Sequence, residues 1–319
     1  MGKDINSKTT LLFDEDFLKE EVRCDYTVTS KTKKIWAIQL DLLHQMIEVC
    51  KKLDIQVYIY AGTLLGAVRH QGFIPWDDDI DVCMKREDFN KLLKLGPKEF
   101  KHPYFLQTGV TDQRFYLDYA RLRNSETTGI IVSQKTADYN NGIYIDVFVL
   151  DGYSEDTQQV SKLISRRNKL KYLVNAYQMN DLDDKNNVKN LLKAFLHYTF
   201  CKVVPLEIVM RWVGRNLSRY NDRTNRLSMM SHPERLYSRY WCTKDEIAEV
   251  VYLPFEGLKV PAPAKYKEIL SHMYGNYMEF PPAEKRGAWH DGVFEFDPEI
   301  SYIEYIQNEK NERSYKEIP

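Results

Sequence analysis

The chain has 319 residues, of which 43% are hydrophobic, enough for one large domain or two modest ones with a packed core. Its 45 Lys and Arg against 46 Asp and Glu argue against a nucleic-acid binder, whose affinity depends on excess basic residues. The five cysteines are widely separated and none lies in a CxxC arrangement, which argues against a disulfide framework or a zinc cluster. The start, MGKDINSKTT, lacks the apolar core of a signal peptide, and no run is long enough to span a bilayer. We therefore expect a cytoplasmic protein.

The first part of the chain predicts a helix, a strand and a glycine turn in succession. Residues 32–53 carry apolar side chains three or four positions apart, the spacing of a helix with one buried face. IQVYIY (55–60) is rich in β-branched and aromatic residues, which predicts a buried strand. Gly62 and Thr63 follow this strand and open a short predicted helix, LLGAVRH, which Gly72 closes.

Acidic residues concentrate directly after this helix. The stretch WDDDIDV (76–82) holds four aspartates in five positions, and IDVCM (80–84) alternates as a strand does. Side chains two positions apart in a strand point to the same side, so we expect Asp79 and Asp81 on one face. GIYIDVFVLDG (142–152) predicts a neighbouring strand, which makes a third carboxylate available, that of Asp146.

The remaining chain shows a change of pattern near residue 153. Residues 86–95 predict a helix that Gly96 and Pro97 end, and FYLDYARLR (115–123) predicts another strand. From about 153 to 250 the pattern becomes helical and strongly basic. The resulting α+β map has an N-terminal extension at residues 1–31 and a mixed core at 32–152. A helical basic insertion follows at 153–249, and a C-terminal segment at 250–319 completes the core.

The three aspartates that share the two predicted strands form a candidate metal site. Carboxylates this close repel one another unless cations or hydrogen bonds compensate. Carboxylates that converge in this way are how proteins hold Mg²⁺ or Mn²⁺ while leaving coordination positions for phosphate oxygens. We therefore expect Asp79, Asp81 and Asp146 to bind a divalent metal. For Asp77 and Asp78 the sequence favours a role in turns or helix caps.

Candidate phosphate-binding residues lie near the aspartates. Gly62 and Thr63 occur where a strand turns into a helix, and the first amides of a helix can hold a phosphate. A lone glycine turn is a weak signal, but the Asp-x-Asp pair about sixteen residues later makes it more specific. Arg69, Arg121 and Arg123 are candidates to neutralise a diphosphate, because the planar guanidinium forms forked contacts with phosphate oxygens. The alternative, a surface ion pair for each arginine, stays open.

Four separated motifs occur in an order typical of one family. AGTLLGAVRHQGFIPWDDDIDV, YARLRNSETTG, GIYIDVFVLDG and FEGLKVPAPAKYKEILSHMYGNYMEFPPAEKR together resemble the LicD family of phosphotransferases, whose core is shared with fukutin and fukutin-related protein. The resemblance covers roughly residues 35–152 and 250–287. Residues 153–249 carry no motif that we can assign.

The resemblance implies a fold, a site and a reaction. The fold is a nucleotidyltransferase-like mixed sheet flanked by helices, with a helical insertion. By position, Gly62 and Thr63 match the phosphate-holding turn, Asp79 and Asp81 the paired metal ligands, and Asp146 the third carboxylate. The reaction is transfer of a phospho-alcohol, typically phosphocholine, from a CDP-activated donor such as CDP-choline to a sugar hydroxyl on a cell-surface glycan or its lipid-linked precursor, with release of CMP.

Other functions stay open at this point. Phosphoribitol or phosphoglycerol transferases use the same type of chemistry, and metal-dependent glycosyltransferases also use an Asp-x-Asp pair. A nucleotidyltransferase would make the activated donor and release pyrophosphate instead of CMP. An inactive glycan-binding module would keep the fold and would not bind Mn²⁺.

The helical region from 189 to 226 interleaves apolar and basic residues, and Pro205 divides it into two pieces. Such a surface could rest against anionic lipid at the inner face of the membrane and present a lipid-linked acceptor. The alternative is that these helices only cover a core.

Overall fold

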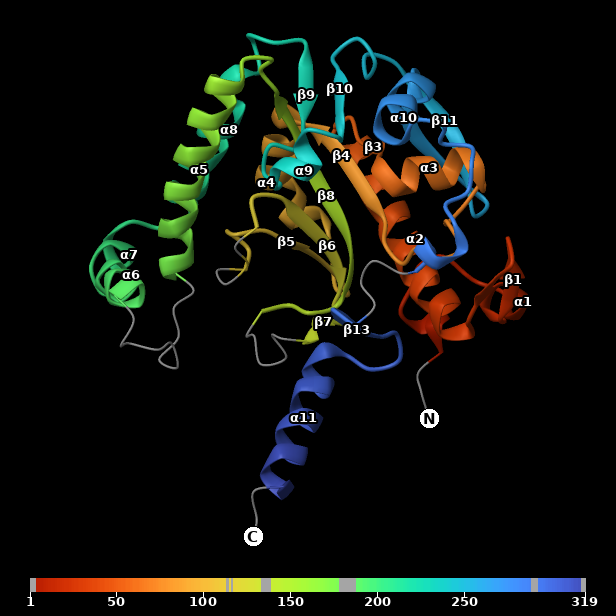
Figure 1. Cartoon of the computed structure of the whole chain (residues 1–319). Helices are drawn as coiled ribbons and strands as arrows, with labels where there is room; N and C mark the ends of the chain where they lie inside the picture. Colours follow the sequence, from red (N-terminus) through yellow and green to blue (C-terminus); the bar gives the residue numbers. More distant parts are fainter. Residues whose placement is uncertain are drawn as a thin grey trace.

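The computed structural model describes residues 4–112, 115, 117–132, 139–177, 188–287 and 292–316. It has the predicted α+β architecture, in which helices flank a central mixed sheet (Figure 1). The strands of this sheet are β3 (Tyr58–Ile59), β4 (Asp81–Lys85), β5 (Tyr104–Gln107), β6 (Ala120–Asn124), β8 (Ile143–Gly152), β9 (Arg226–Ser228) and β10 (Trp241–Thr243).

Strand β8 is the centre of the sheet, and all of its residues are buried. One edge of β8 pairs with β4 in parallel, and β3 follows in antiparallel orientation. The other edge pairs first with β6, beyond which lies β5, and at its carboxyl end with β9, beyond which lies β10. The near-continuous apolar sequence of β8 agrees with a strand covered on both faces.

The helices that pack against this sheet include α2 (Ser30–Lys52), α3 (Ala61–Arg69), α4 (Arg86–Glu99) and α10 (Tyr266–Tyr274). Helix α2 confirms the helix that was predicted from the apolar spacing of residues 32–53, and its Trp36 and Met46 are fully buried. Helix α4 corrects the predicted stop at Gly96, because it continues through Pro97 to Glu99. Pro97 lies in the last turn, where the missing N–H removes little helical bonding, and Phe100 N–H still donates to Gly96 O at 3.2 Å.

The predicted strand at 115–123 is shorter than expected. Strand β6 begins only at Ala120, and Asp118 leaves the sheet. The Asp118 carboxylate is buried and pairs with Arg167 at 3.2 Å and Lys171 at 3.5 Å, both on α5 (Thr157–Tyr177). These ion pairs favour a position of Asp118 outside the sheet. They depend on residues far along the chain, so the local strand pattern could not predict where β6 begins.

The region after β8 builds a second, smaller hydrophobic core. Its helices are α5, α6 (Val188–Tyr198), α7 (Phe200–Val203), α8 (Leu206–Leu217), η3 (Ser218–Tyr220) and α9 (Glu234–Tyr237). Pro205 separates α7 from α8, and buried residues of α5 and α8, such as Leu163 and Val213, pack together. The chain then returns to the sheet through β9 and β10, so this region is not purely helical.

Segments near both ends of the chain pack onto the central fold, whereas the last helix, α11 (Tyr302–Lys316), projects away from it (Figure 1). The N-terminal segment holds η1 (Ile5–Ser7), α1 (Glu15–Leu18) and the hairpin of β1 (Glu21–Arg23) and β2 (Tyr26–Val28). The C-terminal segment holds the hairpin of β11 (Val250–Phe255) and β12 (Leu258–Pro263), then η4 (Ala283–Lys285), β13 (Phe294–Asp297) and α11 (Tyr302–Lys316). Strand β13 pairs with β7 (Thr128–Ile131).

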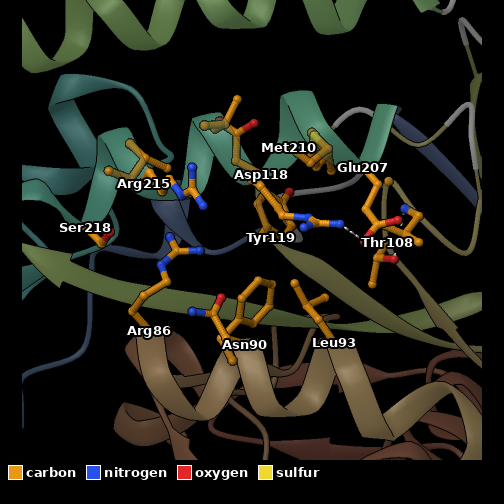
Figure 2. Close-up of a pocket in the computed structure, with 18 of the residues that line it drawn as sticks. Arg86, Asn90, Leu93, Thr108, Asp118, Tyr119, Glu207, Met210, Arg215 and Ser218 are labelled. Atoms are coloured by element: carbon orange, nitrogen blue, oxygen red, sulfur yellow. Dashed lines mark hydrogen bonds and ion pairs between the residues drawn. The ribbon is translucent and has the colours of Figure 1, made fainter. Parts of the chain in front are cut away.

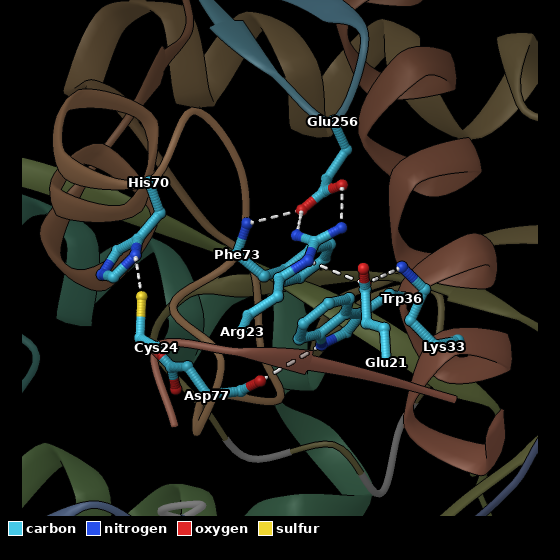
Figure 3. A network of polar contacts seen from close by, with 9 residues as sticks. All are labelled: Glu21, Arg23, Cys24, Lys33, Trp36, His70, Phe73, Asp77 and Glu256. Atoms are coloured by element: carbon cyan, nitrogen blue, oxygen red, sulfur yellow. Dashed lines mark hydrogen bonds and ion pairs between the residues drawn. The ribbon is translucent and has the colours of Figure 1, made fainter. Parts of the chain in front are cut away.

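A polar network joins these ends to the core (Figure 3). Glu256, at the turn of the β11–β12 hairpin, accepts from Arg23 Nη2 at 3.1 Å and from the Phe73 backbone N–H at 3.1 Å. Glu21 forms ion pairs with Arg23 and with the buried Lys33 of α2. The N-terminal hairpin therefore braces the chain that leads into the aspartate-rich loop.

Candidate active site

Parallel strands β4 and β8 bring two aspartates side by side. Asp81 is the first residue of β4 and lies opposite Asp146 of β8 in the register. Neighbouring strands are about 4.8 Å apart, so residues opposite each other in register carry their side chains close together. Asp79 lies in the loop just before β4 and is near enough to Asp81 to act on its ionisation. These residues and Asp77 form the aspartate cluster (Asp77, Asp79, Asp81 and Asp146).

Helix α2 holds the loop that carries this cluster. Trp36 Nε1–H donates to the Asp77 carbonyl at 3.1 Å (Figure 3), and Gln39 Nε2–H donates to the Asp78 carbonyl at 2.7 Å. Positions three apart lie on the same helix face, so one face of α2 fixes two consecutive peptide groups. Sequence reasoning did not identify Trp36 or Gln39, because an apolar helix face gives no sign of hydrogen bonds to a distant loop.

The turn into α3 supports the same loop. The Asp81 backbone N–H donates to Thr63 Oγ1 at 2.8 Å, so Thr63 ties the start of α3 to the start of β4. A Cβ on Gly62 would lie 2.9 Å from Asp77 Oδ2, so a glycine lets this carboxylate approach the helix. The positive backbone angle of the turn falls on Ala61, with φ of 46°, a region that residues other than glycine rarely adopt.

The aspartate cluster carries excess negative charge. Burial, and then the nearby Asp79 and Asp146, raise the pKa of Asp81 well above its usual range, while Arg121 opposes the shift. Burial, and then Asp78 and Asp81, raise the pKa of Asp77 to about 7. In the described part of the chain, no Lys or Arg forms an ion pair with Asp81.

The three candidate arginines lie in different surroundings. Arg121 Nε–H donates to Asp146 Oδ1 at 2.7 Å, so it belongs to the aspartate cluster. Arg123 is fully buried and donates to the Gly142 carbonyl at 2.6 Å, and it also contacts Gln107. Burial, followed by Arg121, lowers the pKa of Arg123 to about 10.

Arg69 is the last residue of α3, and among the described residues its guanidinium forms no hydrogen bond with Arg121 or Arg123. Its Nη1–H groups donate to the carbonyls of Tyr277 at 3.0 Å and Glu279 at 2.9 Å. The structure therefore joins Arg121 to the aspartate cluster, buries Arg123 in the sheet and places Arg69 against the C-terminal segment.

The chemistry of the cluster suits a hard divalent cation. The cluster offers carboxylate oxygens, the ligand type that Mg²⁺ and Mn²⁺ prefer, and their mutual repulsion would fall on cation binding. Across the residues that the structure describes, no three His, Cys, Asp or Glu side chains are arranged as a ready-made metal site.

Comparison with known proteins identifies the domain that holds these residues. Residues 54–172 match the family model described as LicD/FKTN/FKRP, nucleotidyltransferase domain. This stretch is a LicD-family domain. It contains α3, the aspartate-rich loop, β4, β6 and β8, and therefore every residue of the aspartate cluster. The sequence motif at 250–287 lies outside the matched residues.

One of three similar proteins extends the similarity beyond the LicD-family domain. The chain is 25% identical over 259 residues to the lipopolysaccharide cholinephosphotransferase LicD of Haemophilus influenzae, covering 79% of this chain and 92% of that protein. It is 35% identical over 115 residues to the uncharacterized protein RP689 of Rickettsia prowazekii, covering 36% of this chain and 39% of that protein. It is 51% identical over 47 residues to the uncharacterized protein RT0683 of Rickettsia typhi, covering 15% of each.

A histidine from outside the LicD-family domain lies beside the aspartate cluster. The ring of His232 stacks on Tyr119 at 5.1 Å between centroids and meets Phe148 edge-on at 4.7 Å. Burial lowers the pKa of His232 to about 4, and Asp146 acts in the opposite direction. The pairing of β9 with the end of β8 brings His232 here, a long-range contact that local sequence patterns do not reveal.

A cavity of about 590 Å³ lies between α4 and α8 (Figure 2). Its lining combines apolar side chains with polar and charged ones; the apolar residues are Phe89, Leu93, Val110, Leu117, Met210, Val213 and Leu217. Tyr119 forms part of the wall, and burial, followed by Asp146, raises the pKa of its hydroxyl. Through Tyr119 the cavity reaches the neighbourhood of the aspartate cluster. One wall, α8, again lies outside the LicD-family domain.

Proposed function

We propose that the chain transfers a phospho-alcohol, with phosphocholine favoured, from a CDP-activated donor to a sugar hydroxyl on a glycan or its lipid-linked precursor. The observation that carries this proposal is the side-by-side placement of Asp81 and Asp146, with Asp79 beside them, inside a LicD-family domain. The cholinephosphotransferase from Haemophilus influenzae, which aligns over most of both chains, supports choline as the alcohol.

Asp79, Asp81 and Asp146 would hold Mg²⁺ or Mn²⁺ in this reaction. When bound, the cation supplies charge neutralisation for the donor diphosphate. The excess negative charge of the aspartate cluster supports this assignment. Burial, and then repulsion from Asp79 and Asp146, raise the pKa of Asp81, and a bound cation would stabilise the ionised carboxylate against both effects.

The protein residues would position the reacting groups. Asp146, oriented by Arg121, would accept the hydrogen bond of the acceptor hydroxyl and take up its proton as the new oxygen–phosphorus bond forms. The bond between this phosphorus and the CMP oxygen breaks, and CMP leaves with the electron pair. Trp36 and Gln39 would act as positioning residues, since they fix the loop that carries Asp79.

The apolar surface of α6 supports a membrane-bound acceptor. None of the described helices combines the length and apolar character needed to cross a bilayer. Leu191, Leu192, Phe195 and Tyr198 are each at least half exposed, and they follow one another at helical spacing along one side of α6. Lys193 lies among these residues in the sequence, and Lys202 follows them on α7. We propose that this surface rests on anionic lipid.

Sedimentation with vesicles tests this contact. The protein should sediment with vesicles that contain phosphatidylglycerol, and Phe195→Ser should weaken this binding. Binding to neither neutral nor anionic vesicles, or dimerisation through α6 in their absence, would reject the membrane role.

A donor panel tests the proposed reaction. CDP-choline, CDP-ribitol, CDP-glycerol and CDP-ethanolamine are incubated with Mg²⁺ or Mn²⁺, and released CMP is measured. We expect CMP from CDP-choline, none after chelation and at least about 100-fold less from Asp81→Asn. Release of pyrophosphate from CTP and phosphocholine, with no CMP from any CDP-alcohol, would indicate an enzyme that makes the donor.

A further inference from the structure

Two arginines from distant parts of the chain stack on one aromatic ring. The guanidinium carbon of Arg69 lies 5.1 Å from the ring centroid of Phe280, and that of Arg286 lies 5.6 Å from it. Arg286 also lies 5.0 Å from the ring centroid of Trp76, and Trp76 meets Phe280 edge-on at 6.0 Å. Guanidinium groups favour such stacking, so the two rings hold the arginine pair (Arg69 and Arg286) in place.

The arginine pair has no negative partner in the described part of the chain. Besides the carbonyl contacts of Arg69 given above, Arg286 donates to the carbonyls of Pro281 at 2.9 Å and Cys24 at 3.3 Å. No carboxylate among the described residues forms an ion pair with either arginine. Burial, and to a smaller extent Arg286, lowers the pKa of Arg69.

The neighbouring His70 does not compensate this charge. Its Nε2 accepts from Arg69 Nε–H at 3.0 Å, and its ring stacks on Phe280 at 5.4 Å. Burial, followed by Arg69 and Arg23, lowers the pKa of His70 to about 4, so the ring is neutral near pH 7. Among the described residues, no anion therefore balances these two positive charges.

The arginine pair lies close to the aspartate cluster. Trp76, on which Arg286 stacks, immediately precedes Asp77. The Tyr274 hydroxyl lies within electrostatic reach of both groups. Burial raises its pKa most, Asp81 and Asp77 add to the rise, and Tyr274 acts in turn on Arg69. Phe280 is 44% exposed, so a ligand can reach the arginine pair from solvent.

We infer that Arg69 and Arg286 form an anion site that binds a phosphate group of a substrate. Each guanidinium keeps an Nη2 group to which no hydrogen bond within the described residues is assigned, and two such groups suit the oxygens of a phosphate. The arginine pair would bind the anion. The aspartate cluster nearby would bind the cation of the proposed reaction. Only the source of the phosphate rests on the proposed function.

Calorimetric titration with inorganic pyrophosphate tests the site without any turnover. Arg69→Gln and Arg286→Gln should each weaken binding by about 10- to 100-fold, the usual worth of a charged hydrogen-bonded contact. Arg219→Gln removes an exposed arginine outside the site and should leave the affinity unchanged. Equal affinities for the wild type and both site variants would overturn the inference.

Two organic phosphates then distinguish the source. Weaker binding of CDP by Arg286→Gln, with unchanged binding of glucose 1-phosphate, assigns the site to the nucleotide donor. The reverse result assigns it to a phosphorylated acceptor. Pyrophosphate binding that depends on the arginine pair would stand even if no CDP-alcohol yields CMP, so failure of the proposed reaction is distinguishable from failure of this site.

A chemical measurement on the wild-type chain covers the case in which a variant fails to fold. Phenylglyoxal modifies accessible arginines, and mass spectrometry locates the products. Pyrophosphate should protect Arg69 and Arg286 and leave the modification of Arg219 unchanged. Modification of the arginine pair at the same rate with and without pyrophosphate would reject the site.

Discussion

Arg121 lies directly opposite Asp146 in the antiparallel register of β6 and β8, and its Nε–H donates to Asp146 Oδ1 at 2.7 Å. Its guanidinium carbon also lies 3.8 Å from the ring centroid of Tyr144. The same positive charge opposes the rise in the pKa of Asp81. Arg121 thus stabilises two carboxylates on neighbouring strands, and the charge of the site depends on it.

Replacing Arg121 should therefore destabilise the fold. Arg121→Met leaves the buried Asp146 without its ion pair, and removal of one partner of such a pair typically costs about 3–5 kcal/mol. Urea unfolding measures the change in the free energy of unfolding. Arg219→Met, at an exposed position, should change it by less than about 0.5 kcal/mol. An Arg121→Met protein as stable as the wild type would contradict the assigned ion pair.

Neutralising Asp81 should separate activity from stability. Burial and its acidic neighbours raise the pKa of Asp81, so the ionised side chain costs stability once the pH exceeds the ordinary aspartate range. Asp81→Asn should therefore unfold at the same temperature as the wild type or higher at pH 8, in the presence of a chelator. CMP release should fall by about 100-fold or more, because charge stabilisation at the reacting centre is lost. A less stable Asn variant with full activity would refute both assignments.

The two strands that carry the aspartates could be predicted from the sequence. The residues that surround and position these strands could not. The alternation around Asp81 and the apolar run around Asp146 are local patterns, and both strands formed as expected. The roles of Trp36, His232 and Arg286 depend on contacts between segments far apart in the chain, which periodicity does not encode. Local patterns also gave no reason for α4 to continue past Gly96.

The candidate arginines have different surroundings because contacts between distant segments determine their partners. Arg121 and Arg123 alternate on one strand and therefore share a face, yet their cross-strand neighbours differ. Arg121 faces Asp146, whereas Arg123 faces Tyr144 and contacts Gln107 of β5. The register between β5, β6 and β8 determines these partners. The sequence patterns did not predict that register.

His232 should make stability depend on pH below neutrality. Its pKa is about 4 in the folded protein against 6.5 in the unfolded chain. Between these values the unfolded chain binds a proton that the folded protein does not, so stability falls as the pH decreases from about 6.5 to about 4. The loss from this residue should approach about 3 kcal/mol at pH 4.

Urea unfolding of the wild type and His232→Asn at several pH values, with a chelator present, measures this loss. The stability difference between the two proteins should shrink or reverse as the pH falls through this window. An NMR titration of the His232 imidazole gives an independent result. A midpoint near 6.5 in the folded protein would show that the ring is not buried beside Tyr119 and Phe148.

The anchoring of the aspartate-rich loop by α2 gives the last prediction. Trp36→Phe keeps an aromatic ring against Phe73, on which Trp36 stacks at 4.4 Å, but leaves the Asp77 carbonyl without its donor. Gln39→Met keeps the side-chain length and removes the donor to the Asp78 carbonyl. Each change should cost about 1–3 kcal/mol of stability, the usual penalty for an unsatisfied buried group.

Because the loop carries Asp79, both variants should also lower kcat for CMP release, by about tenfold for a displaced group, and raise the Mg²⁺ concentration needed for half-maximal rate. Trp212→Phe is the matched control, since Trp212 is partly exposed on α8 and far in sequence from the loop. A structural role alone would lower stability and leave the Mg²⁺ dependence unchanged. Wild-type kcat and Mg²⁺ dependence in Gln39→Met would therefore show that α2 supports the fold without positioning the aspartates.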